Sequence, residues 1–218
     1  MELIFVGDPM CSWCYGFGKE LSELTARFPQ LPLRIVVGGL RAGATDVLDD
    51  AGKRMRLQHW ARVEQASGLP FNRQGLLDRT GFVYDTEPIC RAVVTARDLA
   101  PEADLLAVFR ALQHAFYVDA LDTTDGHVLA EAGSKALSRL GVAVSADAFL
   151  ARWQAPEIQA QAQADFALAR SWNIRSFPAL LLRIGNALHS IADGYSSAEM
   201  LERHVNAVLE ETAASAGT

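Results

Sequence analysis

The sequence predicts an α/β protein in which both ends of the chain contribute to one mixed sheet and a long helical insertion separates the two contributions. Three observations predict this fold class. Residues 2–40 show a strand, a helix and a second strand, and residues 179–211 show two strands and a helix. The segment between them, 45–172, has helical periodicity without a convincing strand.

The first half of the sheet is predicted from residues 2–40. Residues 2–7 are rich in β-branched and aromatic side chains and are followed by an Asp-Pro turn, which is typical of a buried strand. A helix is expected over 11–28, where Pro29 ends it, and a second buried strand over 33–40. A helical crossover of this length predicts that the two strands are parallel.

The insertion shows a series of amphipathic patterns. Thr86 is expected to be the N-cap of one helix, with Pro88 in its first turn. Another helix is indicated by apolar residues with a 3.6-residue period, at Leu105, Leu106, Phe109, Leu112 and Phe116. Further helices are expected over 46–65, 125–140, 146–153 and 156–172.

The C-terminal part of the chain completes the sheet. Residues 179–184 and 188–193, joined by a Gly-Asn turn, predict an antiparallel hairpin. A last helix is expected over 196–211, and the tail AASAGT, residues 213–218, is expected to be unstructured. The two halves of the sheet come from opposite ends of the chain. The helical segment is therefore expected to be inserted within the sequence of one domain, and not to follow that domain as a separate one.

Composition and charge exclude several classes of partner. The chain has 218 residues, half of them apolar, and a net charge of −6. No cluster of Lys and Arg is longer than that in 53–56, which argues against nucleic acid or an anionic membrane surface as a partner. No apolar stretch approaches the roughly 20 residues of a membrane span. No secretory signal pattern is present either, so a cytoplasmic location is expected.

The stretch MCSWC, residues 10–14, contains two of the three cysteines of the chain, Cys11 and Cys14. A zinc site would need two further ligands, but Cys90 is isolated and the five histidines are scattered, so no metal site is expected. A small secreted domain that is stabilised by disulfides would have more cysteines, in even number. In a chain with a βαβ pattern, the spacing is more typical of a thioredoxin-like redox motif.

Redox chemistry explains this spacing. At the start of a helix, residues three apart lie on one face, within reach of the Cα separation that a disulfide prefers. Cys11 meets the unpaired N–H groups and positive dipole end of the helix, which stabilise a thiolate. Cys14 lies one turn further in and should be more buried. Cys11 is therefore expected to attack and Cys14 to resolve.

Three features of the chain resemble the DsbA family of thiol–disulfide oxidoreductases, which have the thioredoxin fold. They are a strand followed by DPMCSWC, a long helical insertion, and SFPAL opening a late hairpin. The resemblance is strongest to the FrnE-like branch and extends from residue 2 to about residue 211. TEPICRAVV and FYVDALDTTD, within the insertion, also resemble this branch. The resemblance implies a discontinuous thioredoxin-like domain, 1–44 with 173–218, and an insertion domain, 45–172.

The resemblance also implies a substrate-binding site around the cysteines. In the family an X-Pro bond before the hairpin is cis and packs against the disulfide; here it is Phe177-Pro178. The backbone of Phe177 would then be free to bond an extended substrate. Related proteins often have Thr or Val before this proline, so the bulkier Phe177 bears on substrate preference. Trp13, between the cysteines, is expected to contact substrate or to shield the disulfide.

The function that the resemblance implies is disulfide exchange with protein or peptide thiols, with no bound cofactor and with glutathione as a candidate co-substrate. Two alternatives are a glutathione-dependent isomerase of a small aromatic or polyketide substrate on the same fold, and a non-enzymatic adaptor. Similar isomerases usually have serine in place of the first cysteine, so Cys11 and Cys14 favour redox chemistry. Asp8 could cap the helix or accept a proton from Cys14, and Cys90 is expected to be a buried core residue.

Overall fold

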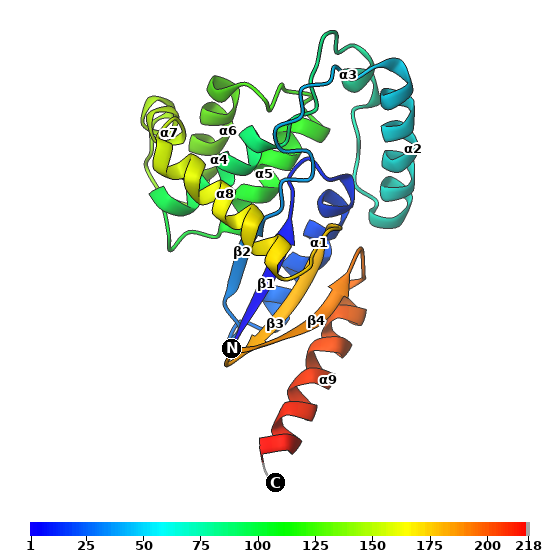
Figure 1. The fold of residues 1–218 in the computed structure, drawn as a ribbon, viewed down its shortest axis with the longest axis vertical. Helices are drawn as coiled ribbons and strands as arrows, with labels where there is room; N and C mark the ends of the chain where they lie inside the picture. The colour runs from blue at the N-terminus through cyan, green and yellow to red at the C-terminus, as the bar shows by residue number, and fades with distance from the viewer. Residues whose placement is uncertain (217–218) are drawn as a thin grey trace.

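The computed structural model describes residues 1–216, which form a four-stranded mixed sheet with helices on both faces (Figure 1). The strand order is β2-β1-β3-β4. The strands are β1 (Glu2–Gly7), β2 (Leu33–Val37), β3 (Ala179–Ile184) and β4 (Ala187–Asp193). As predicted, β1 and β2 are parallel and β3 and β4 form an antiparallel hairpin. The central strand β1 also pairs antiparallel with β3, which joins the two ends of the chain.

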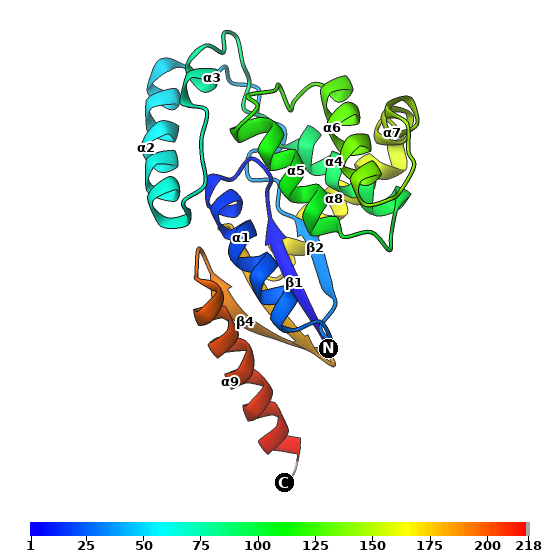
Figure 2. The ribbon, with the colours of Figure 1, turned by 180° about the vertical axis from the view of Figure 1, so that it is seen from behind.

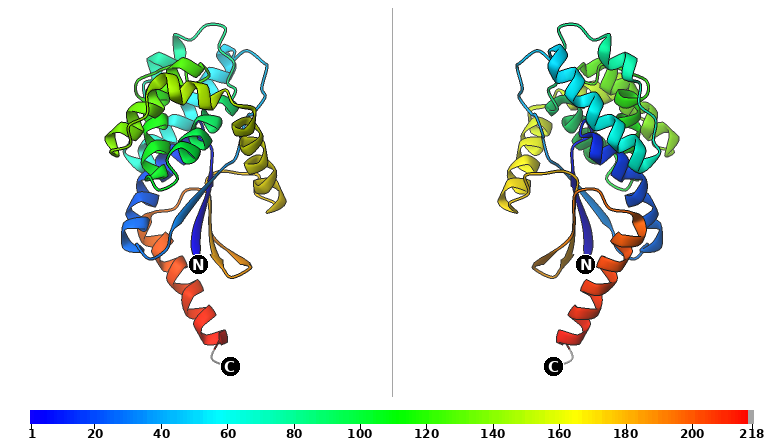
Figure 3. Two further views of the ribbon diagram at one scale, coloured as in Figure 1. Left: turned by 90° about the vertical axis from the view of Figure 1, so that its left-hand side faces the viewer. Right: turned by 90° about the vertical axis from the view of Figure 1, so that its right-hand side faces the viewer.

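The alternation of side chains along β1 separates two layers of core. Leu3 and Phe5 point to the face covered by α1 (Ser12–Arg27) and α9 (Ala198–Ala216). Ile4 and Val6 point to the opposite face, where α8 (Pro156–Ser171) covers the sheet, as Figure 3 shows. Because both faces are buried, the strand is apolar without interruption from Leu3 to Val6.

The chain between β2 and β3 is helical, as predicted; most of it lies above the carboxyl ends of β1 and β2, and its last helix, α8, returns along the sheet (Figures 1 and 2). It comprises α2 (Asp50–Ser67), α3 (Arg73–Leu77), α4 (Glu87–Leu99), α5 (Leu105–Tyr117), α6 (Gly126–Arg139), α7 (Ala146–Trp153) and α8. The short helix α3 was not predicted, because five residues are too few to show periodicity. The division into the domains 1–44 with 173–218 and 45–172 stays a prediction.

Some boundaries differ from the sequence-based expectations. Strand β2 ends at Val37 rather than at residue 40, because Gly39 has a φ of 62° and turns the chain away. Helix α2 starts at Asp50, since Val47 pairs with Val83 in an isolated bridge instead. Helix α9 runs over 198–216, so residues 213–216 are helical and not unstructured as expected; 217–218 lie outside the described residues.

Thr86 is the N-cap residue of α4, as predicted, but its hydroxyl does not cap the helix. Its Oγ1 instead accepts a hydrogen bond from Arg41 N at 3.1 Å. The free amide of Glu87 at the start of α4 is satisfied by Asp85 Oδ1 at 2.9 Å. The polar side chains at this helix end therefore hold the loop after β2 as well as the helix.

Within residues 1–216, no helix is long and apolar enough to span a membrane.

Candidate active site

Cys11 and Cys14 lie at the N-terminus of α1, where the chain leaves the sheet. Cys11 is the N-cap residue, with extended backbone dihedral angles, and its amide donates to Asp8 O at 3.0 Å. Its carbonyl accepts from Tyr15 N at 3.0 Å, which closes the first turn of the helix. Among the described residues, no side chain caps this end, so the free amides of the first turn remain beside Cys11.

The two sulfurs occupy different environments, and both cysteines are free thiols in this structure. Cys11 is 7% exposed, whereas Cys14 is fully buried. Burial, with the neighbouring Cys11 as a second cause, holds the pKa of Cys14 well above its usual value. Cys14 is therefore a protonated thiol behind Cys11, and of the two residues only Cys11 retains exposed surface.

The loop before β3 lies against Cys11. The Phe177–Pro178 peptide bond is cis, as the resemblance implied. The Cys11 thiol lies 3.5 Å from the carbonyl oxygen of Phe177, close enough to donate a weak hydrogen bond to it. The ring of Phe177 covers Gly38, where a Cβ atom would come within 2.2 Å of the ring. Glycine at the end of β2 is thus what allows Phe177 to pack here.

Asp8 lies behind the cysteines and is fully buried. Its Oδ1 accepts from Met10 N at 2.8 Å and its Oδ2 from Leu40 N at 2.7 Å. It does not cap α1, so the expectation of a capping role was wrong. Burial raises the pKa of Asp8, and hydrogen bonds to the carboxyl, first among them that of Thr86, act against the increase. A buried carboxyl near Cys14 is suited to exchanging a proton with it.

Trp13 packs on the segment before α9. Its ring centroid lies 5.8 Å from that of Tyr195, whose hydroxyl donates to Ala66 O at 3.1 Å. The side chain is half-buried and in contact with the main core. Part of Trp13 is therefore used in holding α1, the end of α2 and the start of α9 together.

Two tyrosines from the insertion approach the cysteines from within and were not identified from the sequence. The hydroxyl of Tyr84 donates to Met10 O at 2.7 Å, directly before Cys11. The ring of Tyr117 stacks on Tyr15, with centroids 4.7 Å apart. Burial raises the pKa of both insertion tyrosines, so both hydroxyls remain neutral. Among the described residues, the buried hydroxyl of Tyr117 has no hydrogen-bond partner. Tyr117 lies in the motif FYVDALDTTD, but nothing local indicates what its ring contacts.

The third cysteine is part of the core, as predicted. Cys90 is fully buried on α4, and burial raises the pKa of its thiol well above the usual value. Among residues 1–216, no group of three or more His, Cys, Asp or Glu side chains is arranged to hold a metal ion.

No protein-family model matches the chain, and no curated protein matches it. Several solved structures, however, are similar to this chain. A candidate protein disulfide isomerase from Nitrosomonas europaea is 31% identical, with a TM-score of 0.85 over 96% of this chain and 97% of that one. The cytosolic disulfide reductase DsbM from Pseudomonas aeruginosa is 25% identical, with a TM-score of 0.73 over 97% and 98%, and has also been solved with glutathione.

A 2-hydroxychromene-2-carboxylate isomerase has a TM-score of 0.65 at 15% identity, over 98% of both chains, which shows a shared fold alone. Taken with the site, these structures define the class: a thioredoxin-fold protein with a helical insertion and two cysteines at the start of α1. Within that class, the chain belongs to the DsbA family of thiol–disulfide oxidoreductases.

Proposed function

We propose that this protein exchanges disulfides with protein or peptide substrates through Cys11 and Cys14, and that it works mainly as a reductase. The observation that carries the proposal is the asymmetry of the pair. Cys11 reaches the surface at a helix N-terminus, and Cys14 is buried one turn behind it as a protonated thiol. The Cys11 sulfur can react with a substrate, whereas the buried Cys14 sulfur can react only with Cys11.

The exchange takes place in two steps. The Cys11 thiolate attacks one sulfur of a substrate disulfide, the substrate S–S bond breaks, and the leaving thiolate takes a proton from water. Cys14 then passes its proton to the Asp8 carboxylate and attacks Cys11 Sγ. The mixed disulfide breaks, and the second substrate sulfur leaves as a thiolate. Two electrons have passed to the substrate, and a Cys11–Cys14 disulfide remains.

Asp8 suits the second step because its burial raises its pKa, so its carboxylate binds a proton more strongly than an exposed one would. The substrate is held by the loop before β3. In this proposal the backbone of Phe177 bonds an extended peptide, while Pro178 and Trp13 form the edges of the binding surface.

Glutathione is the thiol that we propose regenerates the enzyme. Two glutathione molecules reduce the Cys11–Cys14 disulfide and become one molecule of oxidised glutathione, which balances the cycle. The support is the likeness to DsbM, a cytosolic reductase solved with glutathione and 26% identical in that structure. We propose a cytoplasmic location on the same ground; the redox poise there favours reduction or shuffling of substrate disulfides.

Trapping the mixed disulfide tests the proposal. Cys14→Ser should still attack oxidised insulin and accumulate covalent adducts that dithiothreitol releases, whereas Cys11→Ser should form none. Cys90→Ser is the matched control and should behave as the wild type, since Cys90 is buried in the core. Non-reducing gels of the three variants give the readout.

The other outcomes of this experiment are equally informative. Adducts on Cys11→Ser but not on Cys14→Ser would reverse the two roles. Adducts on neither variant would contradict disulfide exchange and favour the glutathione-dependent isomerase or the adaptor.

A further inference from the structure

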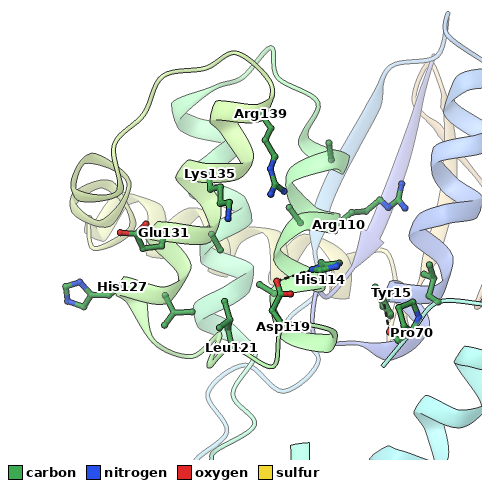
Figure 4. A pocket seen from close by; sticks show the side chains of 16 residues that line it. Tyr15, Pro70, Arg110, His114, Asp119, Leu121, His127, Glu131, Lys135 and Arg139 are labelled. Carbon is green, nitrogen blue, oxygen red and sulfur yellow. Dashed lines mark hydrogen bonds and ion pairs between the residues drawn. The ribbon is translucent and has the colours of Figure 1, made fainter. Parts of the chain in front are cut away.

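A cleft of about 1150 Å³ lies between α5 and α6 on one side and α1 with the loop after α2 on the other (Figure 4). The residues that we propose for disulfide exchange, namely Cys11, Cys14, Trp13, Phe177 and Pro178, form the exchange site. None of them lines this cleft. Its nearest link to the exchange site is Tyr15, whose hydroxyl donates to Pro70 O at 3.1 Å and forms one wall. Its volume is slightly above the 300–1,000 Å³ that is typical of small-molecule sites, so a small organic molecule fits in it.

The floor of the cleft is apolar and made of small side chains. Ala107, Ala111 and Ala115 recur every fourth residue along α5 and therefore lie on one face of the helix. Val128 and Ala132 of α6 line the adjoining side. Larger side chains at these positions would fill the space, so the alanine row is the reason that two neighbouring helices leave a hollow.

The walls of the cleft carry cations without counter-ions. Lys135 and Arg139 are one turn apart on α6, and within residues 1–216 neither makes an ion pair or a side-chain hydrogen bond. Like charges at this spacing repel each other and destabilise a helix. Glu131 could have paired with Lys135, but Figure 4 shows it directed away from α5, whereas Lys135 and Arg139 are directed toward it.

The remaining charged groups of the cleft leave this positive charge in place. Asp119 is engaged by His114 Nδ1 at 3.1 Å, and Arg110 of α5 donates to Ser22 Oγ at 2.9 Å. The exposed walls of the cleft thus have an excess of positive charge in a protein whose net charge is −6. A guanidinium and an ammonium group above an apolar floor are complementary to a ligand with one anionic end.

We propose that this cleft binds a small organic anion, with its apolar body on the alanine floor and its carboxylate, sulfonate or phosphate group between Lys135 and Arg139. Binding here is independent of disulfide exchange, since none of the residues that carry it belongs to the exchange site.

The test uses two fluorescent probes of nearly the same shape. The anion is 8-anilino-1-naphthalenesulfonate, and its uncharged analogue is N-phenyl-1-naphthylamine. The native protein should bind one anion per chain, with a Kd roughly tenfold lower than for the neutral probe. The double variant Lys135→Gln/Arg139→Gln should remove that advantage, and Ala111→Phe should block both probes. Arg54→Gln, an exposed cation on α2 outside the cleft, is the matched control and should change neither.

Insulin reduction by the same variants separates this site from the exchange site, because all of them should retain it. Circular dichroism and thermal unfolding check that Ala111→Phe is folded, and the double variant alters only exposed side chains. Equal affinity of the native protein for the two probes, or unchanged anion binding in the double variant, would overturn the proposal. So would the absence of anion binding to the native protein.

Discussion

Asp8 joins three parts of the molecule at one carboxyl group. It follows β1, accepts hydrogen bonds from the amides of Met10 and Leu40, and lies against Thr86 and Cys90 of α4. The carboxyl is fully buried, and burial is the largest cause of its raised pKa. A single residue behind the cysteines therefore links the proton chemistry of the site to the stability of the fold.

Asp8→Asn should gain stability relative to the wild type as pH rises from about 4 to about 7. The pKa of Asp8 is above 3.8 in the folded protein, so the folded state binds the proton more tightly than the unfolded state. This contribution to wild-type stability is complete below the unfolded pKa and is lost as pH rises through the folded pKa, at up to about 1.4 kcal/mol per pH unit. Asparagine does not titrate.

Urea unfolding of both proteins across this pH range measures the difference in the free energy of unfolding. A difference that stays flat, or that moves in favour of the wild type as pH rises, would contradict the assignment of a raised pKa to Asp8.

At the scale of elements, α1 is held by close helix–helix contacts at two glycines. A Cβ atom on Gly16 would come within 2.8 Å of Val63 Cγ1 of α2. A Cβ atom on Gly18 would meet Arg110 Cγ of α5 at 3.3 Å. Glycine is a poor helix former. Its presence here, just after the cysteines, is explained by the approach of two helices from the insertion.

Gly16→Ala should lower the free energy of unfolding by about 1–3 kcal/mol, because Val63 is fully buried and its branched side chain cannot move aside. Gly18→Ala is the matched control. The Arg110 side chain is long enough to shift, and alanine gains up to about 1 kcal/mol in helix propensity, so the change should be neutral or stabilising. Urea unfolding of the pair provides the measurement. Equal losses in both variants would show that helix packing does not distinguish the two positions.

At the scale of the whole molecule, the sheet and the insertion share one core. Phe5 of β1 packs edge-on against Phe109 of α5, with ring centroids 5.3 Å apart. Asp165 of α8 accepts from Val37 N at 3.1 Å and from Arg97 Nη1 at 2.9 Å. Arg97 of α4 also donates to Ile35 O at 3.0 Å. The edge strand β2 is thereby tied to two helices of the insertion.

Asp165→Ala should lower the free energy of unfolding by about 3 kcal/mol, since it leaves the Arg97 charge and the Val37 amide without their partner. Glu202→Ala removes one side of the exposed ion pair with Arg27 and should cost less than about 1 kcal/mol.

Because the core is continuous, far-UV circular dichroism and tryptophan fluorescence should report one coincident urea transition. Two separate transitions would instead indicate that the sheet and the insertion unfold independently.

The sequence by itself determined the order of the elements, the parallel and antiparallel strand pairs and the position of Cys11 and Cys14 at a helix start. These features depend on side-chain patterns within a few residues, on burial period and on turn residues. The five-residue α3 and the end of β2 were missed, since a short helix shows no period and a buried strand merges with an apolar loop.

Only the tertiary structure decided what surrounds the cysteines. Tyr84 beneath Met10, the Phe177 ring over Gly38 and the two amides on Asp8 join residues that are far apart in the sequence or in different elements. Each residue type has several ordinary uses: Asp8 could have capped a helix, and Trp13 could have been fully exposed. Which use is realised depends on the neighbours that packing supplies, and no local pattern specifies those neighbours.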